Sequence, residues 1–531
     1  MTRSISRLTL VLFVSSFLLT TASLHASDWH EKTPTIDQSL EMYNVSGPKI
    51  SPDGTRVIYE QSRTNWDANA FETDLWIANV ATGERHLLVT TGHSSSYAAW
   101  SPDGKWIAFL SSRKGVLPKS PDDKQQLWVM PADGGEAQQL TKMEEGASGF
   151  AWALDSRHIA LAAESPKTKA MKDREESFGE YHVIHADYQM VHLWWMELPV
   201  ADSASRPTAP AEPKLLTPGD SFSVADFSIS PDGKQIAFGA TVDPDLISEG
   251  TEDIYTVPTA GGAVRKIVDT YGPDSNPQWS PDGQEIAYQT ANGSKYYYYT
   301  DQRIAVVPST GGTPTVLTEA FDEDAGLIRW APEGIYFSAL HGMAASLYRL
   351  DTKSKAVERI EMPGSSFAGQ FSFSKDFSKV AFRGAGANEY PEIYESALSA
   401  PKPVQLTVAG DQLKSFDVAQ REVVRWKSGD GTEIEGVLYK PASFDAKKKY
   451  PLLVVIHGGP TGIDMPMRNP DRYYQIERFV AKGALVLRPN YRGSAGYGER
   501  FRSLNVRNLG VGDYADVISG VDSLIAQGFV D

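Results

Sequence analysis

The amino-acid sequence predicts a seven-bladed β-propeller, an all-β unit, over residues 44–410, followed over residues 411–531 by the first part of an α/β domain. Three observations lead to this prediction. The tetrapeptide Ser-Pro-Asp-Gly recurs through the middle of the chain, a second strand pattern follows each copy, and after Arg421 long apolar strands alternate with helical patterns. Short strands that repeat with a period of about 50 residues are typical of a propeller. Alternation of strands and helices is typical of a parallel sheet.

The bulk composition narrows the function classes before any motif is considered. The chain has 531 residues, a net charge of -16 and no cysteine. A chain of this length needs more than one hydrophobic core. The acidity argues against nucleic acid or an anionic membrane surface as a partner, because both require basic patches. The missing cysteines exclude disulfides, thiolate metal sites and a cysteine nucleophile.

The first 26 residues are predicted to be a secretory signal peptide. Arg3 and Arg7 precede an apolar stretch that begins at Leu8, and Ala22 and Ala26 are candidate cleavage positions. The apolar stretch is short for a membrane span; an uncleaved anchor is the alternative. Residues 27–43 form a lead segment before the propeller. The expectation is export to a bacterial periplasm or beyond, with no stable membrane insertion after cleavage.

Seven copies of the repeat predict seven blades. The copies begin at Ser51, Ser101, Ala153, Ser230, Ser280, Ala331 and Ser374. In each intact turn, proline sets the first central φ, and Asp and Gly suit the remaining positions of a type I-like turn. An alternating strand with a polar or Gly-rich hairpin turn follows each copy. The alternative, a set of unrelated turns, does not account for the regular spacing.

The interval between the third and fourth copies is longer than the others and contains two groups of candidate ligand-binding residues. Glu175 and Glu176 could bind the amino group of a ligand; a solvated loop is the alternative. His182, His185 and His192 suggest a metal site. However, His182 and His185 are expected on opposite faces of a strand, so no metal site is predicted.

The segment after Arg421 is expected to form a hairpin, two strands and two helices. The hairpin turns at residues 428–431, and "YPLLVVIHGGP" contains a buried strand of the parallel type. A helix follows, with Ile476, Phe479 and Val480 on one face. The next buried strand lies in "ALVLRPNYRGSAGYG", and the last helix in "GDYADVISGVDSLIAQG". Asp513 is expected to cap this last helix and Gly528 to follow its end.

The order of these motifs resembles that of the prolyl oligopeptidase family of serine peptidases. A propeller of Ser-Pro-Asp-Gly repeats is followed by a hairpin, then by "VIHGGP", then by "PNYRGSAGYG". The acylaminoacyl-peptidase and dipeptidyl-peptidase branch is the most similar. The resemblance covers nearly the whole chain after the signal peptide and implies an α/β-hydrolase domain that acts on oligopeptides. It also implies that neither a metal nor an organic cofactor is needed.

The resemblance places the His-Gly-Gly-Pro loop, residues 457–460, beside the nucleophile, where it helps to form an oxyanion hole. The physical reason is that preorganised backbone N–H groups stabilise a negative tetrahedral intermediate, and glycine lets the backbone approach closely. Gly458 and Gly459 are the candidate donors, Gly459 being the better one, and a purely structural turn is the alternative. His457 and Pro460 belong to the same active-site loop, but His457 is not expected to be the general base.

The second Gly-rich segment, "NYRGSAGYG", is expected to form a wall of the active site. Tyr491 and Arg492 are its candidate residues, with Arg492 expected to hold the loop rather than to touch substrate. Ser494 lies in this segment, but its spacing to the glycines does not fit a nucleophile.

The nucleophile motif G-x-S-x-G of α/β hydrolases does not occur in the 531 residues. The triad of these enzymes runs Ser, acid, His in chain order. The Ser, the acid and the His are therefore expected beyond Asp531, and the 531-residue chain alone is predicted to be an inactive fragment.

Two other functions remain open at this point. A non-catalytic propeller that binds protein partners in the periplasm, similar to the TolB translocation protein, would explain the repeats but not the segment after Arg421. An esterase would suit the same oxyanion loop. The sequence does not indicate an oligomeric state or a cleavage specificity.

Overall fold

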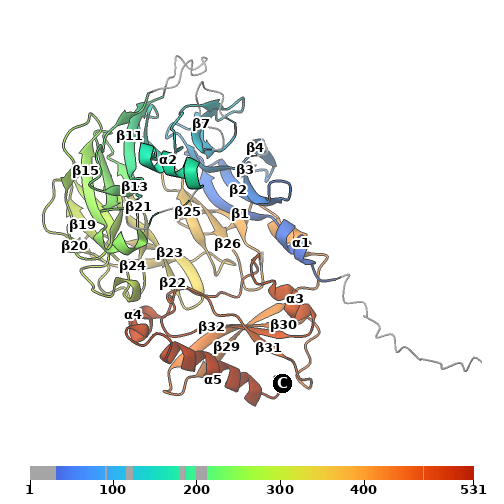
Figure 1. Cartoon of the computed structure of the whole chain (residues 1–531). Coiled ribbons are helices and arrows are strands. Elements are labelled where there is room, and N and C mark those ends of the chain that lie inside the picture. The colour runs from blue at the N-terminus through green and yellow to red at the C-terminus, as the bar shows by residue number, and fades with distance from the viewer. Residues whose placement is uncertain are drawn as a thin grey trace, which may run out of the picture.

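The computed structural model describes residues 32–89, 93–114, 124–179, 181, 183, 187–198, 212–469 and 472–531. These residues form a β-propeller with a smaller α/β unit against one of its faces (Figure 1). The predicted signal peptide, residues 1–26, and two of the three histidines, His182 and His185, lie outside the described residues. No helix in the described ranges is long and apolar enough to cross a membrane.

The propeller consists of seven four-stranded antiparallel sheets, which confirms the seven predicted blades. The innermost strands are β1 (Asn44–Ile50), β5 (Ser95–Trp100), β9 (Gly149–Trp152), β13 (Ser223–Ile229), β17 (Asp274–Trp279), β21 (Gly326–Ala331) and β25 (Gly369–Phe373). The second strands are β2 (Arg56–Asn65), β6 (Trp106–Ser111), β10 (His158–Glu164), β14 (Gln235–Thr241), β18 (Glu285–Thr290), β22 (Gly334–His341) and β26 (Lys379–Gly384).

The fourth, outermost strand is the shortest strand of every blade. The third strands are β3 (Ala70–Asn79), β7 (Gln126–Pro131), β11 (Val191–Glu197), β15 (Asp253–Pro258), β19 (Arg303–Pro308), β23 (Ala344–Leu350) and β27 (Glu392–Ala397). The fourth strands are β4 (Arg85–Val89), β8 (Gln138–Gln139), β12 (Lys214–Leu215), β16 (Arg265–Lys266), β20 (Thr315–Val316), β24 (Val357–Ile360) and β28 (Val404–Gln405).

Each Ser-Pro-Asp-Gly turn joins the first strand of a blade to the second. In the second blade the Ser101 hydroxyl donates to Asp103 at 2.6 Å and accepts the N–H of Trp106 at 3.0 Å. Gly104 has φ +74°, which glycine adopts without strain. The serine is fully buried. The repeated sequence therefore forms a tight turn in which the buried serine hydroxyl is hydrogen-bonded.

Tryptophans that precede the turns of some blades join these blades to their neighbours. The indole N–H of Trp100 donates to the carbonyl of Lys49 in the preceding blade at 2.9 Å, and that of Trp279 to the carbonyl of Ser228 at 3.2 Å. The ring closes where the N–H of Ile50 donates to the Ser372 hydroxyl at 3.1 Å. Hydrophobic clusters lie between blades, and one of them packs β1–β3 against the seventh blade.

The insertion in the third blade forms a helix, α2 (Lys169–Phe178), capped by Thr168. The solvated loop weighed as an alternative for Glu175 and Glu176 is therefore wrong. Thr168 accepts the N–H of Met171, and Met171 is buried, which fixes the first turn of the helix. Short 3₁₀ turns occupy η1 (Leu246–Thr251), η2 (Tyr297–Tyr299) and η3 (Ala409–Leu413).

The α/β unit has a four-stranded sheet in the order β29-β30-β32-β31. Its strands are β29 (Gln420–Lys427), β30 (Glu433–Lys440), β31 (Leu452–Val454) and β32 (Leu485–Asn490). The predicted hairpin is β29–β30, and β31 and β32 are parallel. The helices are α3 (Ile476–Ala481), α4 (Gly498–Arg502), η4 (Ser503–Asn505) and α5 (Gly512–Ala526).

Three details of the α/β unit differ from the sequence expectation. β31 has only three residues and is half-buried, because it lies at the edge of the sheet with β32 as its one neighbouring strand among the described residues. Phe479 is 44% exposed, whereas Ile476 and Val480 are buried. Asp513 lies inside the first turn of α5, and Val511 takes the capping position.

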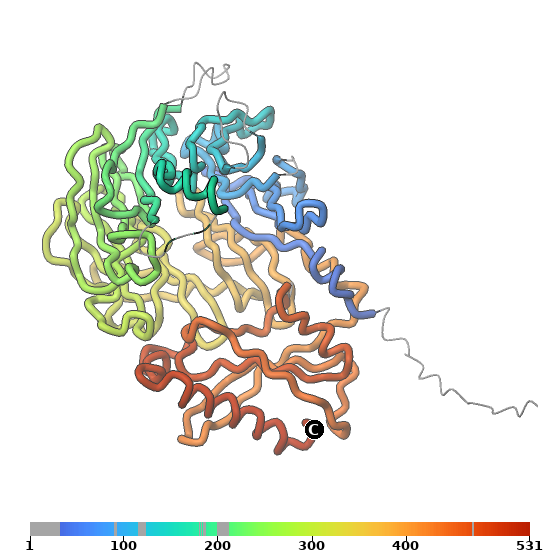
Figure 2. The backbone as a smooth tube through the Cα atoms, in the orientation of Figure 1, coloured from blue at the N-terminus to red at the C-terminus, as the bar shows by residue number. Residues whose placement is uncertain are grey.

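Helix α1 (Ile36–Glu41), at the start of the described chain, lies between the propeller and the α/β unit (Figure 2). The N–H of Asp417 donates to the carbonyl of Lys32 at 2.5 Å. The lead segment is thus held against the connection between the two units.

Candidate active site

The loops that leave the two parallel strands face the propeller. The N–H of Gly342, in the β22–β23 hairpin, donates to the carbonyl of Gly496 at 2.5 Å. The N–H of Asn388, between β26 and β27, donates to the carbonyl of Pro466 at 2.8 Å. Ligands of α/β sheets bind outside the carboxyl ends of the parallel strands. The candidate site is therefore at the boundary between the two units (Figure 1).

The two glycines of the loop after β31 present bare backbone. Gly458 and Gly459 are exposed, and a Cβ at either would meet no atom within 4 Å. Gly459 has φ +55°. Among the described residues, neither N–H donates to a protein acceptor, while the carbonyl of Gly459 accepts the N–H of Gly462 at 2.6 Å. The loop thus offers two adjacent N–H donors that no acceptor in the described part of the chain engages. Pro460 follows them, half-buried.

His457 and Ser494 form a brace rather than a catalytic pair. His457 Nε2 lies 3.1 Å from the Ser494 hydroxyl, which donates its only proton to the carbonyl of Tyr491 at 2.7 Å. Nε2 must therefore carry the proton of this hydrogen bond, and the imidazole is not placed to accept one from Ser494. Ser494 is fully buried, and burial lowers the pKa of His457.

Tyr491 fixes the base of the His-Gly-Gly-Pro loop. Its hydroxyl donates to the carbonyl of His457 at 2.9 Å, and its ring stacks on the imidazole with centroids 4.6 Å apart. The candidate Tyr491 therefore holds the residue that precedes the two exposed glycines.

Arg492 is buried and points away from the exposed loop. Its Nε and Nη2 donate to the two oxygens of Asp516 at 2.9 and 2.7 Å, and Nη1 lies 3.0 Å from Asp430. Asp516 comes from α5 and Asp430 from the hairpin turn, so Arg492 joins three segments. Asp516 is buried in α5 with Gly520 and Leu524, whereas the apolar Tyr514 and Ile518 of the same helix are exposed, so the helical spacing of apolar residues did not indicate this pairing.

Asn490 joins the exits of both parallel strands, and its importance was not visible in the sequence. Its side chain accepts the N–H of Asp464 at 2.8 Å and donates to the carbonyl of the same residue at 2.9 Å. Arg488 pairs with the Asp464 carboxylate at 2.7 Å, but burial still raises the pKa of Asp464. Asn490 is fully buried. These bonds hold the loop after β31 to the end of β32.

The last residues pair with the free edge of the sheet. Val530 forms a parallel bridge with Tyr450, and the N–H of Asp531 donates to the carbonyl of Tyr450 at 3.0 Å. This edge is beside β31, whose exit loop carries Gly458 and Gly459.

Comparisons with known proteins show similarity to peptidases. A sequence model of the Prolyl oligopeptidase family matches residues 471–531. Dipeptidyl-peptidase 5 of Porphyromonas gingivalis is 26% identical over 522 residues, which are 94% of this chain and 73% of that protein. The uncharacterized peptidase YuxL of Bacillus subtilis (strain 168) is 26% identical over 519 residues, 94% of this chain and 76% of that protein. The chain belongs to the prolyl oligopeptidase family.

The fold of this prolyl oligopeptidase family member matches solved structures along nearly all of its length. The acylaminoacyl peptidase of Pyrococcus horikoshii superimposes with a TM-score of 0.72 at 19% identity. The match covers 94% of this chain and 74% of that chain. The propeller and the start of a hydrolase domain are thus arranged as in a known peptidase fold, and residues 420–531 are called the hydrolase part below.

Glu175 and Glu176 lie on α2, which is inserted between the second and third strands of its blade. The equivalent connections in other blades contain Gly342 and Asn388, which contact the hydrolase part. Both glutamates are therefore on the propeller face that carries the hydrolase part. Glu175 accepts a hydrogen bond from Lys167 at 2.8 Å, whereas Glu176 is exposed.

His192 is the histidine of the three-histidine group that lies among the described residues. His192 is buried in β11, and burial lowers the pKa of its imidazole. Within the described residues, no group of three or more His, Asp or Glu side chains could hold a metal ion.

A cluster of charges joins the fifth and sixth blades to α4. Arg502 donates to Asp324 and lies 3.7 Å from Asp301, and the N–H of Gly498 donates to Glu323 at 2.9 Å. Burial raises the pKa of Asp301 to about 7 and that of Glu323 to about 7. This contact could not be predicted from the sequence, because its partners are far apart along the chain.

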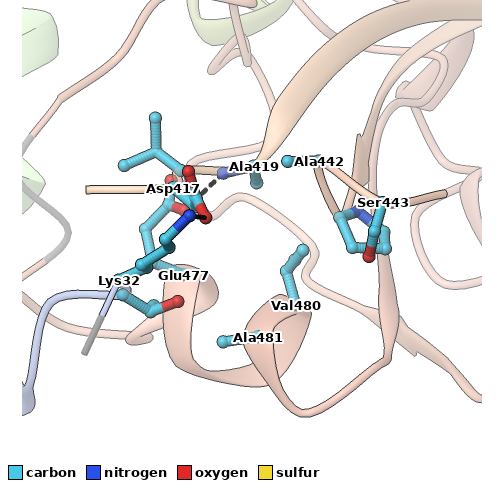
Figure 3. A pocket seen from close by; sticks show the side chains of 11 residues that line it. Lys32, Asp417, Ala419, Ala442, Ser443, Glu477, Val480 and Ala481 are labelled. Atoms are coloured by element: carbon cyan, nitrogen blue, oxygen red, sulfur yellow. Dashed lines mark hydrogen bonds and ion pairs between the residues drawn. The ribbon is translucent and has the colours of Figure 1, made fainter. Parts of the chain in front are cut away.

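A pocket of about 370 Å³ lies on another side of the hydrolase part (Figure 3). Val480 and Ala481 of α3 line it, with Lys32 and Asp417 3.8 Å apart at one end. It contains no residue of the His-Gly-Gly-Pro loop, so it is not part of the candidate active site.

Proposed function

We propose that this family member is an exported serine peptidase that cleaves short peptides through an acyl-enzyme intermediate. The observation that carries the proposal is the pair of N–H groups at Gly458 and Gly459, which have no acceptor among the described residues and follow the carbonyl that Tyr491 holds. In this chemistry a serine attacks the scissile carbonyl and a histidine moves its proton. The two N–H groups would stabilise the negative oxygen that develops.

The nucleophile, the acid and the histidine of the triad are proposed to lie outside these 531 residues. Two facts support this placement. No G-x-S-x-G occurs in the sequence, and the relatives extend beyond the portion that this chain covers. The nucleophile of such a fold follows a strand of the same sheet, and Val530 begins to pair at the free edge beside β31. We therefore expect the 531-residue chain alone not to hydrolyse peptides.

A fluorophosphonate probe, which reacts with activated serines, tests the proposal. We expect it to label the protein isolated from the native cell envelope, together with hydrolysis of dipeptidyl- or acylaminoacyl-aminomethylcoumarin substrates. The purified 531-residue chain should not be labelled. Labelling of the 531-residue chain, or its hydrolysis of these substrates, would show that the triad is placed wrongly. Absence of labelling in the native protein would remove the peptidase proposal.

A matched pair of substitutions in the native protein tests the oxyanion loop. Gly458→Pro removes an N–H, while Gly458→Ala keeps it and meets no atom within 4 Å. Loss of one oxyanion donor lowers kcat by about 10²–10³-fold. If Gly458 is one of the donors, the proline variant should lose that much and the alanine variant should stay near wild type. Equal activity of the two variants would assign the donor to Gly459 alone.

The cleavage mode is proposed to involve a free peptide N-terminus. The similarity to dipeptidyl-peptidase 5 and the exposed carboxylate of Glu176 on the hydrolase-facing side support this mode. We expect Glu175→Ala and Glu176→Ala to raise KM for substrates with a free amine and to leave acetylated substrates unaffected. An unchanged preference in both variants would exclude these residues as the amine anchor.

Export is proposed from residues 1–26 alone. N-terminal sequencing of the protein from a periplasmic fraction should begin near residue 27. A protein that still begins at Met1 in that fraction would support the uncleaved anchor instead.

A further inference from the structure

The axis of the propeller contains a cavity of about 710 Å³ to which all seven blades contribute. Its walls are the last residues of the innermost strands and the first residues of the Ser-Pro-Asp-Gly turns. The hydrolase part contacts the opposite ends of the blades, through the hairpins of Gly342 and Asn388. The cavity therefore lies at the mouth of the channel that faces away from the hydrolase part, and we call it the outer cavity.

The outer cavity is lined by three cations and no acidic side chain, although the chain as a whole has a net charge of -16. The cations are Lys49, Arg329 and Lys375. Lys49 and Arg329 occupy the same position in their blades, two residues before the first residue of the turn. The other five blades have small or neutral residues at this level, namely Ala99, Ala151, Ser228, Gln278 and Ser372.

Lys49 and Arg329 have no counterion among the described residues. Both are accessible from the channel, but the surrounding protein desolvates them and lowers the pKa of each. Glu60 is the acid whose charge acts on Lys49, but its carboxylate accepts the N–H of Tyr97 at 2.8 Å and forms no ion pair with the lysine. Two cations without an ion pair among the described residues, in a cavity that no acidic side chain lines, make its surface locally positive and favourable to an anion.

The walls around the cations are aromatic and fixed in position. Trp100, Trp152 and Trp279 line the cavity, and each indole N–H donates to a backbone carbonyl of the neighbouring blade. Phe371 and the prolines of the turns add further apolar surface. Ligand sites typically have volumes of roughly 300–1,000 Å³, apolar walls and a few polar groups that orient the ligand. The outer cavity is larger than an inorganic anion requires.

We propose that the outer cavity binds the terminal carboxylate of a short peptide, with Lys49 and Arg329 on the carboxylate and the aromatic walls on its apolar side chains. This site is separate from the oxyanion loop and does not depend on peptide cleavage. It would hold the carboxyl end of a peptide in the channel, or a released fragment.

Calorimetric titration of the 531-residue protein with N-acetyl-Gly-Pro-Phe tests the proposal, because acetylation blocks removal from a free N-terminus. The free acid should bind at least tenfold more tightly than the same peptide with a C-terminal amide. Lys49→Gln and Arg329→Gln should each reduce that difference about tenfold. Lys234→Gln is the matched control, since this lysine follows the turn of the fourth blade and its side chain is 79% exposed. This variant should bind the free acid with the wild-type affinity.

Three results would overturn the proposal. One is equal affinity of the acid and the amide in the wild-type protein, a comparison that needs no variant to fold. Another is an unchanged difference in both the Lys49 and Arg329 variants, which lie on separate blades. The third is an affinity for inorganic phosphate, measured by competition with the bound peptide, that equals the affinity for the acetylated peptide acid. The cavity would then be a general anion site.

Discussion

The propeller and the hydrolase part are stabilised in different ways. In the propeller, one turn and one inter-blade contact are repeated from blade to blade, as the Ser101–Asp103 and Ser280–Asp282 hydrogen bonds show. The hydrolase part depends on buried ion pairs that occur once, such as Arg492 with Asp516. The propeller can lose one of its repeated turn hydrogen bonds and keep the others, whereas a buried ion pair of the hydrolase part has no second copy. Substitutions should therefore have small, additive effects in the propeller and large effects in the hydrolase part.

Asp516→Ala should have the largest effect. Asp516 is fully buried and is paired with Arg492 through two oxygens. Removing one partner of a buried pair typically costs about 3–5 kcal/mol, because the other charge stays buried and unpaired. We expect hydrogen exchange to accelerate over residues 485–526 and to remain unchanged in the propeller.

Asp522→Ala is the matched control for this comparison, since Asp522 lies on the same helix and is exposed. It should leave the exchange of both regions at the wild-type rate. Retention of wild-type protection in the Asp516 variant would show that the hydrolase part does not depend on this ion pair.

The same difference explains how far the sequence could predict the structure. Every blade repeats a local pattern, so the seven turns and their strands could be located from residues close together in the chain. The hairpin turn at residues 428–431 and the strand β32 were also predicted, because their patterns are local. Long-range contacts carry no such pattern.

The parts that could not be predicted depend on residues that meet only in the fold. The exposure of Phe479 follows from the packing of a single short helix, not from its helical spacing. The role of Asn490 requires that two strand exits lie side by side. The segment around Glu175, for which a solvated loop was the alternative, forms a helix because Thr168 caps it and Met171 is buried in its first turn. In the site itself, the glycines were predictable from their motif, but the brace of His457 on Ser494 was not.

The boundary between the two regions should respond to pH with an effect of intermediate size. Burial raises the pKa of Asp301 and of Glu323 to about 7 in the docked state. A carboxyl group whose pKa is raised by docking stabilises the docked state fully below its undocked pKa of about 4. This stabilisation is lost as the pH rises through about 7. Docking should therefore weaken from pH 6 to pH 8, by about 1–3 kcal/mol for the two groups together.

Two introduced cysteines can measure this docking, because the chain has none of its own. Fluorophores at the exposed positions Lys353→Cys and Lys427→Cys would report the distance between the propeller and the hydrolase part. Glu323→Gln keeps an oxygen for the N–H of Gly498 without the charge, so it should reduce the pH response to the part that Asp301 contributes. A distance that is shorter at pH 8 than at pH 6 would reverse the assigned sign.

The smallest effect is expected for single turns of the propeller, and it is also the sharpest test of the comparison. Asp282 accepts hydrogen bonds from the Ser280 hydroxyl at 2.7 Å and the N–H of Gln284 at 3.0 Å, and the hydrogen bond from Ser280 lowers the pKa of its carboxyl group. Because Asp282 is exposed, Asp282→Ala should cost about 1 kcal/mol or less. The equivalent Asp103→Ala, three blades away, should cost a similar amount, and distant effects add. Calorimetric melting should therefore show two small decreases in Tm that sum in the double variant. A single variant that unfolded its blade, or a double variant far worse than the sum, would show that the turns act as one unit rather than as independent copies.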